Sequence, residues 1–106
     1  MKTKNLVAAV VAVLVVSVAG IVFAHTPIFS CFLNEDGTVM CEGGFSDGSS
    51  AAGVTVRVFD IQKKVLMEGE MDEFGTFVFN KPEVDYFVVM DAGPGHTVEI
   101  KGDNIQ

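Results

Sequence analysis

The chain has 106 residues, of which 14 are acidic and 7 are basic, so its formal net charge is −7 at pH 7. A chain of this length forms one small domain, and the negative charge argues against nucleic acid or an anionic membrane surface as a partner. Without Lys2 and Lys4 the charge becomes −9 over residues 25–106. That part of the chain attracts small cations.

The first element in chain order is the uncharged apolar run 6–24, which is dominated by valine and alanine. Lysines before such a run and small residues at its end are typical of a secretory signal peptide, and Val22 and Ala24 fit cleavage after Ala24. The run is also close to the ~20 residues that span a bilayer. We therefore expect residues 1–24 to be a signal peptide or an uncleaved membrane anchor. Residues 25–106 would then be exported, to the periplasm or the outer face of the cytoplasmic membrane.

The rest of the chain has a β pattern throughout. Apolar and polar residues alternate in seven short runs: PIFSCFL, TVMCEGGF, VTVRVFD, VLMEGEM, TFVFN, DYFVVMD and TVEIK. Clusters rich in glycine, asparagine, aspartate and proline separate the runs, as is typical of tight turns. This pattern predicts an all-β fold, a small seven-stranded antiparallel β-sandwich over residues 25–106.

The first turn, Asn34-Glu35-Asp36-Gly37-Thr38, fits a type I turn closed by a glycine in the left-handed region. Counting outward from it places Cys31 opposite Cys41 at a non-hydrogen-bonded position, where Cα atoms lie about 4.5 Å apart. Such a pair can form a disulfide, and an exported chain reaches an oxidising compartment. We therefore predict a Cys31–Cys41 disulfide. The alternative is two buried thiols, and a zinc site is disfavoured because further ligands are missing.

The stretch 72–76 repeats this turn pattern. Interpreted as a second hairpin, it pairs Asp72 with Thr76. The same count gathers one apolar face, made of Val65, Met67, Met71, Phe77 and Phe79. We expect these methionines to pack in the core rather than to bind copper, because methionine fills irregular core gaps well. The chain shows no catalytic motif, and we do not expect an enzyme.

The two histidines, His25 and His96, are the candidate metal ligands. After cleavage His25 would begin the mature chain, so its α-amino nitrogen and ring Nδ1 would chelate one metal ion, and His96 would add a third nitrogen. Nitrogen ligands with open positions suit Ni(II) or Cu(II). Pro27 has no N–H and keeps further backbone nitrogen out of the site. The alternative is a mobile terminal His25 and an exposed turn residue His96, with no metal.

Three motifs carry a resemblance to a known family: CEGGFSDG at 41–48, DEFGTFVF at 72–79 and DAGPGH at 91–96. From His25 to about Gly102 the chain resembles the small extracytoplasmic accessory subunits of energy-coupling-factor nickel and cobalt transporters. The hairpin motifs also occur in transthyretin-like (prealbumin-like) and carboxypeptidase-regulatory-like sandwiches. Thr97 stands where the family usually has arginine, and the cysteine pair is not a family feature.

The resemblance implies metal capture outside the membrane and delivery to the membrane subunits of a nickel or cobalt transporter, without catalysis. Ni(II) is the expected metal, with Co(II) or Cu(II) as alternatives. The turn made of Asp91, Gly93, Pro94 and Gly95 would hold His96 in place. The competing hypothesis is an exported or membrane-anchored β-sandwich that docks a protein partner through its strand edges and binds no metal.

Overall fold

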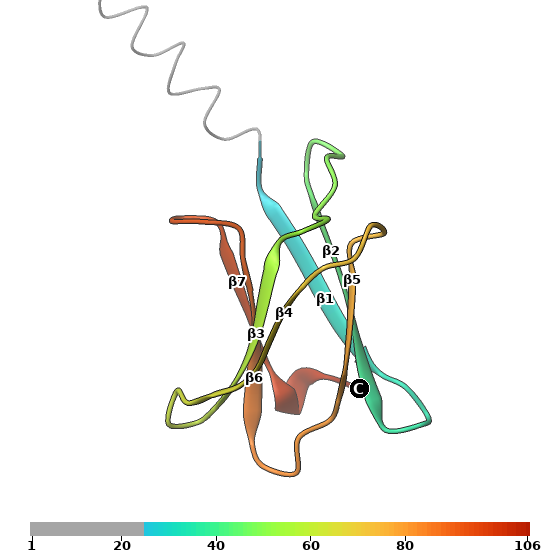
Figure 1. Ribbon diagram of the computed structural model, residues 1–106, viewed down its shortest axis with the longest axis vertical. Helices are drawn as coiled ribbons and strands as arrows, with labels where there is room; N and C mark the ends of the chain where they lie inside the picture. The colour runs from blue at the N-terminus through green and yellow to red at the C-terminus, as the bar shows by residue number, and fades with distance from the viewer. Residues whose placement is uncertain (1–24) are drawn as a thin grey trace, which may run out of the picture.

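The computed structural model describes residues 25–106, so the predicted signal peptide or anchor of residues 1–24 lies outside the described part. Within residues 25–106 there are seven strands and one short 3-10 helix (Figure 1). The elements are β1 (Pro27–Leu33), β2 (Thr38–Phe45), β3 (Thr55–Asp60), β4 (Val65–Glu70), β5 (Thr76–Asn80), β6 (Tyr86–Asp91), β7 (Thr97–Lys101) and η1 (Gly102–Asn104). Each predicted run contains one strand, so the all-β prediction is confirmed.

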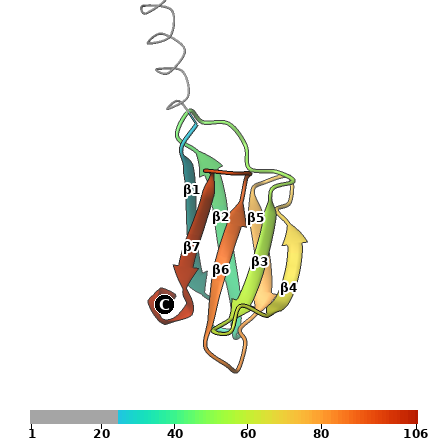
Figure 2. The same cartoon turned by 90° about the vertical axis from the view of Figure 1, so that its left-hand side faces the viewer.

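The strands of this region form two antiparallel sheets, one of three strands in the order β1-β2-β5 and one of four in the order β4-β3-β6-β7. In Figure 2 the four-stranded sheet faces the viewer and the three-stranded sheet lies behind it. The arrangement is sandwich-like, as expected. None of the helices between residues 25 and 106 is long and apolar enough to cross a membrane.

The core lies between the two sheets and follows from the alternation of side chains along each strand. The largest side chains that are fully buried in the described chain are Val39, Cys41, Val56, Val58, Val88 and Met90. They come from β2, β3 and β6, the inner strands of the two sheets. Burying one such apolar side chain contributes roughly 1.5–3 kcal/mol, so the inner strands of both sheets help to drive the stacking.

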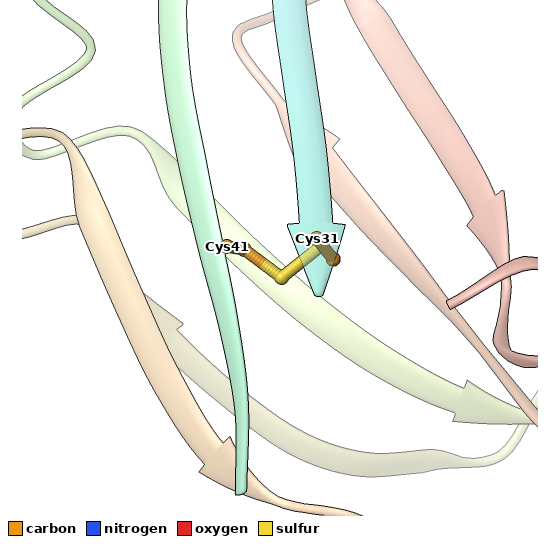
Figure 3. Close-up of a disulfide and its surroundings, with 2 residues drawn as sticks. All are labelled: Cys31 and Cys41. Carbon is orange, nitrogen blue, oxygen red and sulfur yellow. A yellow bond between two sulfur atoms is a disulfide. The ribbon is translucent and has the colours of Figure 1, made fainter. Parts of the chain in front are cut away.

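The first hairpin has the predicted register. Cys31 pairs with Cys41, and the Asn34 N–H donates to the Thr38 carbonyl at 2.8 Å. Gly37, at φ 87°, takes the left-handed conformation that closes the turn. Figure 3 shows the resulting disulfide between β1 and β2, with Cα atoms 4.0 Å apart. Both the register and the disulfide prediction are confirmed.

The second hairpin prediction is wrong beyond its turn. The turn itself forms, since the Asp72 N–H donates to the Thr76 carbonyl at 2.9 Å and Gly75 has φ 72°. The strands on either side belong to different sheets, however, because β4 pairs with β3 and β5 pairs with β2. The chain crosses between the sheets at this turn.

The crossing changes which of the expected apolar residues are buried. Met71 and Phe79 are in the core, and Met67 and Phe77 pack against it. Val65 is 45% exposed, because it lies at the outer edge of the four-stranded sheet rather than opposite β5. A tight turn can therefore join two strands of one sheet or one strand from each, and the burial of distant strands decides between them.

The turns gather at two ends of the sandwich (Figure 1). The loops 46–54, 71–75 and 92–96 lie at the end where the described chain begins at His25. The loops 34–37, 61–64 and 81–85 lie at the other end, together with η1 and the C-terminus. Residues from widely separated parts of the sequence thus meet at the first end.

Candidate functional site

The structure brings the two histidines to one place. His25 and His96 line an open pocket of about 230 Å³, together with Phe45, Ser49 and Ala92. Each histidine stands just before a strand, His25 before β1 and His96 before β7, and these two strands start at the same end of the sandwich and lie side by side (Figure 2). Their meeting is a consequence of how the two sheets stack.

His25 is held by the loop that follows β2. Its Nδ1 lies 2.6 Å from Oδ2 of Asp47, and the two side chains are 59% and 29% exposed. Since a carboxylate only accepts hydrogen bonds, Nδ1 must carry the proton. In a neutral ring the unprotonated nitrogen is then Nε2. His25 therefore offers Nε2, rather than Nδ1, to a ligand in this arrangement.

Asp47 is itself fixed by Ser49. The Ser49 backbone N–H and hydroxyl both donate to Oδ1 of Asp47, at 3.0 Å and 2.6 Å. The hydroxyl lowers the pKa of Asp47 most, followed by the Ser49 N–H, with a smaller contribution from the charge of His25. The carboxylate is therefore kept ionised, with Oδ2 available to His25.

The backbone next to His25 is tied to the same loop. The Thr26 N–H donates to the Ser46 hydroxyl at 3.0 Å, and the Ser46 N–H donates to the Thr26 carbonyl at 2.8 Å. These bonds continue the ladder beyond the Pro27–Phe45 pair at the end of the β1–β2 register. The position of His25 is thus set by the two hydrogen bonds between Thr26 and Ser46 as well as by the contact of its ring with Asp47.

His96 closes a tight turn between β6 and β7. The Ala92 N–H donates to the His96 carbonyl at 3.0 Å, and the His96 N–H donates to the Gly93 carbonyl at 2.9 Å. Gly93 and Gly95 have φ angles of 110° and 77°, a region that side chains strongly disfavour. The glycines of the DAGPGH motif are therefore required by the geometry of this loop.

The ring of His96 repeats the arrangement of His25. Its Nδ1 lies 3.1 Å from the carbonyl oxygen of Pro94. A carbonyl only accepts, so Nδ1 donates, and in a neutral ring Nε2 is the unprotonated nitrogen. The loop is anchored by Asp91, whose Oδ1 accepts the Gly93 N–H at 3.0 Å. Of the four residues predicted to support His96, Gly93, Pro94 and Gly95 belong to this turn, and Asp91 ends β6 directly before it.

Two residues that contact the expected site residues, Asp47 and Arg57, were not predicted from the sequence. Asp47 belongs to the quoted motif CEGGFSDG but had no role assigned, and Arg57 donates through Nη1 to Oδ2 of Asp91 at 2.8 Å. This bond is the main cause that lowers the pKa of Asp91, and the Gly93 N–H is the second. The available signal was the single arginine of the chain, placed between Val56 and Val58 in the middle of a strand.

Imidazole rings are common ligands of transition metal ions. Metal-binding histidines typically donate the second ring N–H to a carboxylate or a backbone carbonyl, which are the partners found for His25 and His96. Among residues 25–106, however, no group of three or more histidine, cysteine or acidic side chains is placed to hold a metal. The described side chains that line the pocket therefore include two candidate ligands, both imidazoles.

A larger pocket of about 570 Å³ lies at the opposite end of the sandwich. It is lined by Gly37, Lys81, Pro82, Glu83, Val84, Asp85, Tyr86, Gly102, Asp103 and Ile105. Burial, together with the charge of Asp103, raises the pKa of Tyr86, so its hydroxyl stays protonated. The pocket contains none of the candidate metal-site residues predicted from the sequence.

Fold and site define a class of protein: a disulfide-containing β-domain of two stacked sheets with a two-histidine pocket at one end. No family model, curated protein or solved structure matches the chain.

Proposed function

We propose that the protein is an extracytoplasmic metal-binding accessory protein that captures Ni(II) through His25 and His96 and passes it to a membrane transporter. Co(II) and Cu(II) are the alternatives, since imidazole suits all three metals. One observation carries the proposal: the two histidines of the chain line the same pocket, each with Nδ1 against an oxygen acceptor.

Two binding modes are compatible with the residues. In the first, the Nε2 atoms of His25 and His96 bind the metal while Asp47 and Pro94 keep the Nδ1 protons. In the second, cleavage after Ala24 frees the α-amine of His25, which chelates together with Nδ1, and the metal replaces the contact with Asp47. Both modes leave coordination positions open, and a site with few protein ligands suits capture followed by release.

The cellular context is inferred from the disulfide and from the family resemblance. Disulfides persist in oxidising compartments, so the Cys31–Cys41 bond favours an exported protein. The resemblance to accessory subunits of nickel and cobalt transporters suggests the partner, which is the membrane subunits of such a transporter. The hairpin motifs suggest that the sandwich is of the prealbumin-like subclass. The acidic domain would attract cations to this surface.

Nickel titration of three proteins tests the proposal: one starting at His25, one with an extra N-terminal methionine, and His96→Ala. We expect His96→Ala to weaken binding by about tenfold or more, which is a loss of about 1.4 kcal/mol. The extra methionine weakens binding only if the α-amine is a ligand. Because protons compete for the ligand nitrogens, affinity should fall as the pH drops from about 8 to about 6. Equal affinity in the wild-type and His96→Ala proteins would contradict the proposal.

A partly exposed apolar row favours a second function, a protein-interaction module without metal. Phe32, Met40 and Val78 lie opposite one another across the three-stranded sheet, and Val78 is 52% exposed. Contiguous apolar surface often marks a binding site. A mature protein that binds no nickel would leave this function as the better explanation.

A further inference from the structure

Arg57 is the only arginine of the chain, and it connects the central strand β3 to the loop that carries His96. Its Nη1 lies 2.8 Å from Oδ2 of Asp91, and its Nε lies 3.5 Å from Oε2 of Glu68. The Arg57 side chain is 31% exposed and the Asp91 side chain 32%, whereas that of Glu68 is 55% exposed. The shorter and less exposed of the two contacts is therefore the one to Asp91.

The sheet register explains why this arginine reaches this aspartate. Arg57 pairs with Val89 on β6, and Asp91, two residues further along β6, pairs with Thr55. Residues two apart on a strand point to the same face of the sheet. Arg57 and Asp91 are therefore diagonal neighbours on one face of the four-stranded sheet. Only a long side chain spans such a diagonal, and the planar guanidinium can contact two carboxylates at once.

The carboxylate of Asp91 is shared between the sheet and the loop. Oδ2 accepts from Arg57, and Oδ1 accepts from the Gly93 N–H at 3.0 Å. Gly93 in turn provides the carbonyl that accepts the His96 N–H. A continuous series of hydrogen bonds thus runs from the middle of the sheet, through Asp91 and Gly93, to the histidine of the pocket.

We propose that Arg57 is a positioning residue for His96. By fixing the Asp91 carboxylate, Arg57 holds the 92–96 turn in the form that keeps Nδ1 of His96 on the Pro94 carbonyl and leaves Nε2 for the pocket. The effect on metal affinity rests on the proposed function, whereas the effect on the ring of His96 in metal-free protein does not. An arginine that merely stabilised the sheet would alter the resistance to denaturant and leave that ring unchanged.

The experiment compares Arg57→Gln, Arg57→Lys, Asp91→Asn, the double variant Arg57→Gln/Asp91→Asn, and Glu68→Gln as the matched control. Glu68→Gln removes the other acidic partner of Arg57 and leaves the bond to Asp91 in place. Three quantities are measured for each protein: the dissociation constant for Ni(II), the imidazole ¹⁵N chemical shifts of His96 without metal, and the denaturant midpoint.

We expect Arg57→Gln and Asp91→Asn each to weaken Ni(II) binding by about tenfold, the lower range for residues that support a ligand. Both should shift the ¹⁵N signals of His96 away from the tautomer protonated at Nδ1. The double variant should bind no more weakly than Asp91→Asn alone, because residues that act through one another are not additive. Arg57→Lys should recover part of the loss, and Glu68→Gln should stay within about twofold of wild type.

Two results would overturn the inference. One is a folded Arg57→Gln protein with wild-type His96 signals and wild-type nickel affinity, and the other is full additivity in the double variant. If Arg57→Gln does not fold, the Asp91→Asn variant decides, because it leaves β3 intact. Unchanged His96 signals in Asp91→Asn would equally refute the proposed positioning of His96 by Arg57 and Asp91. A wild-type protein that binds no nickel ends the proposed function, while the metal-free spectra still decide whether Arg57 positions the ring.

Discussion

His25 and His96 have the same chemical arrangement although they come from the two ends of the domain's sequence. Each ring has Nδ1 against an oxygen, a carboxylate at 2.6 Å for His25 and a carbonyl at 3.1 Å for His96. Each therefore presents Nε2 as its basic nitrogen. The residue type alone predicts both histidines as candidate ligands. Which ring nitrogen each histidine offers depends on its contact with Asp47 or Pro94, and that contact is set by the fold.

Replacing Asp47 distinguishes the two metal-binding modes. If the metal binds Nε2 of His25, Asp47→Asn should weaken Ni(II) binding by about tenfold, because the carboxylate orients the ring and increases its basicity. If the metal binds Nδ1 together with the α-amine, the same change should leave the affinity equal or higher, because Asp47 then competes with the metal. Calorimetric titration of the protein that begins at His25 measures the difference.

Asp36→Asn is the matched control for this measurement. Asp36 accepts from the Thr38 N–H and hydroxyl at 3.0 Å and 2.6 Å, the same pattern that Asp47 makes with Ser49. It lies in the turn 34–37, at the end of the sandwich away from the histidines. A loss of nickel affinity in Asp36→Asn as large as in Asp47→Asn would mean that the effect is general destabilisation.

At the scale of elements, the hairpin β1–β2 followed from local sequence and the crossing from β4 to β5 did not. A type I turn closed by a glycine sets the register of its two flanking strands. It does so only where those two strands pair with each other. Strands β1 and β2 do so, and the disulfide joins them. Strands β4 and β5 leave a turn of the same form but pair with β3 and β2.

The disulfide should stabilise the domain as a whole. We expect the double substitution Cys31→Ala/Cys41→Ala to lower the free energy of unfolding by roughly 2–3 kcal/mol, because the closed loop is short and the bond restricts the unfolded chain. Part of the loss comes from packing, since Cys41 is fully buried in the core. Urea denaturation of oxidised wild-type and variant proteins measures it. An unchanged midpoint would show that the bond adds nothing to the stability of the sandwich.

At the scale of the whole molecule, the sandwich should fold without metal. Its core is made of apolar side chains from both sheets, and neither His25 nor His96 belongs to that core. Metal should therefore increase the free energy of unfolding only by its binding to the folded protein, which is about 2.7 kcal/mol when the free metal concentration is a hundredfold above the dissociation constant. Circular dichroism with and without a chelator checks this, and loss of the β spectrum on chelation would show that the metal is structural.

The sequence by itself determined the positions of the strands, the first turn and the Cys31–Cys41 pair. These features depend on alternation with a period of two and on one tight turn, and both are local. The tertiary structure decided which strands share a sheet, that His25 and His96 line one pocket, and that Asp47 contacts His25 while Arg57 contacts Asp91. The physical reason is that sheet membership is set by burying apolar faces of strands far apart in the chain, and no local pattern specifies which faces will meet.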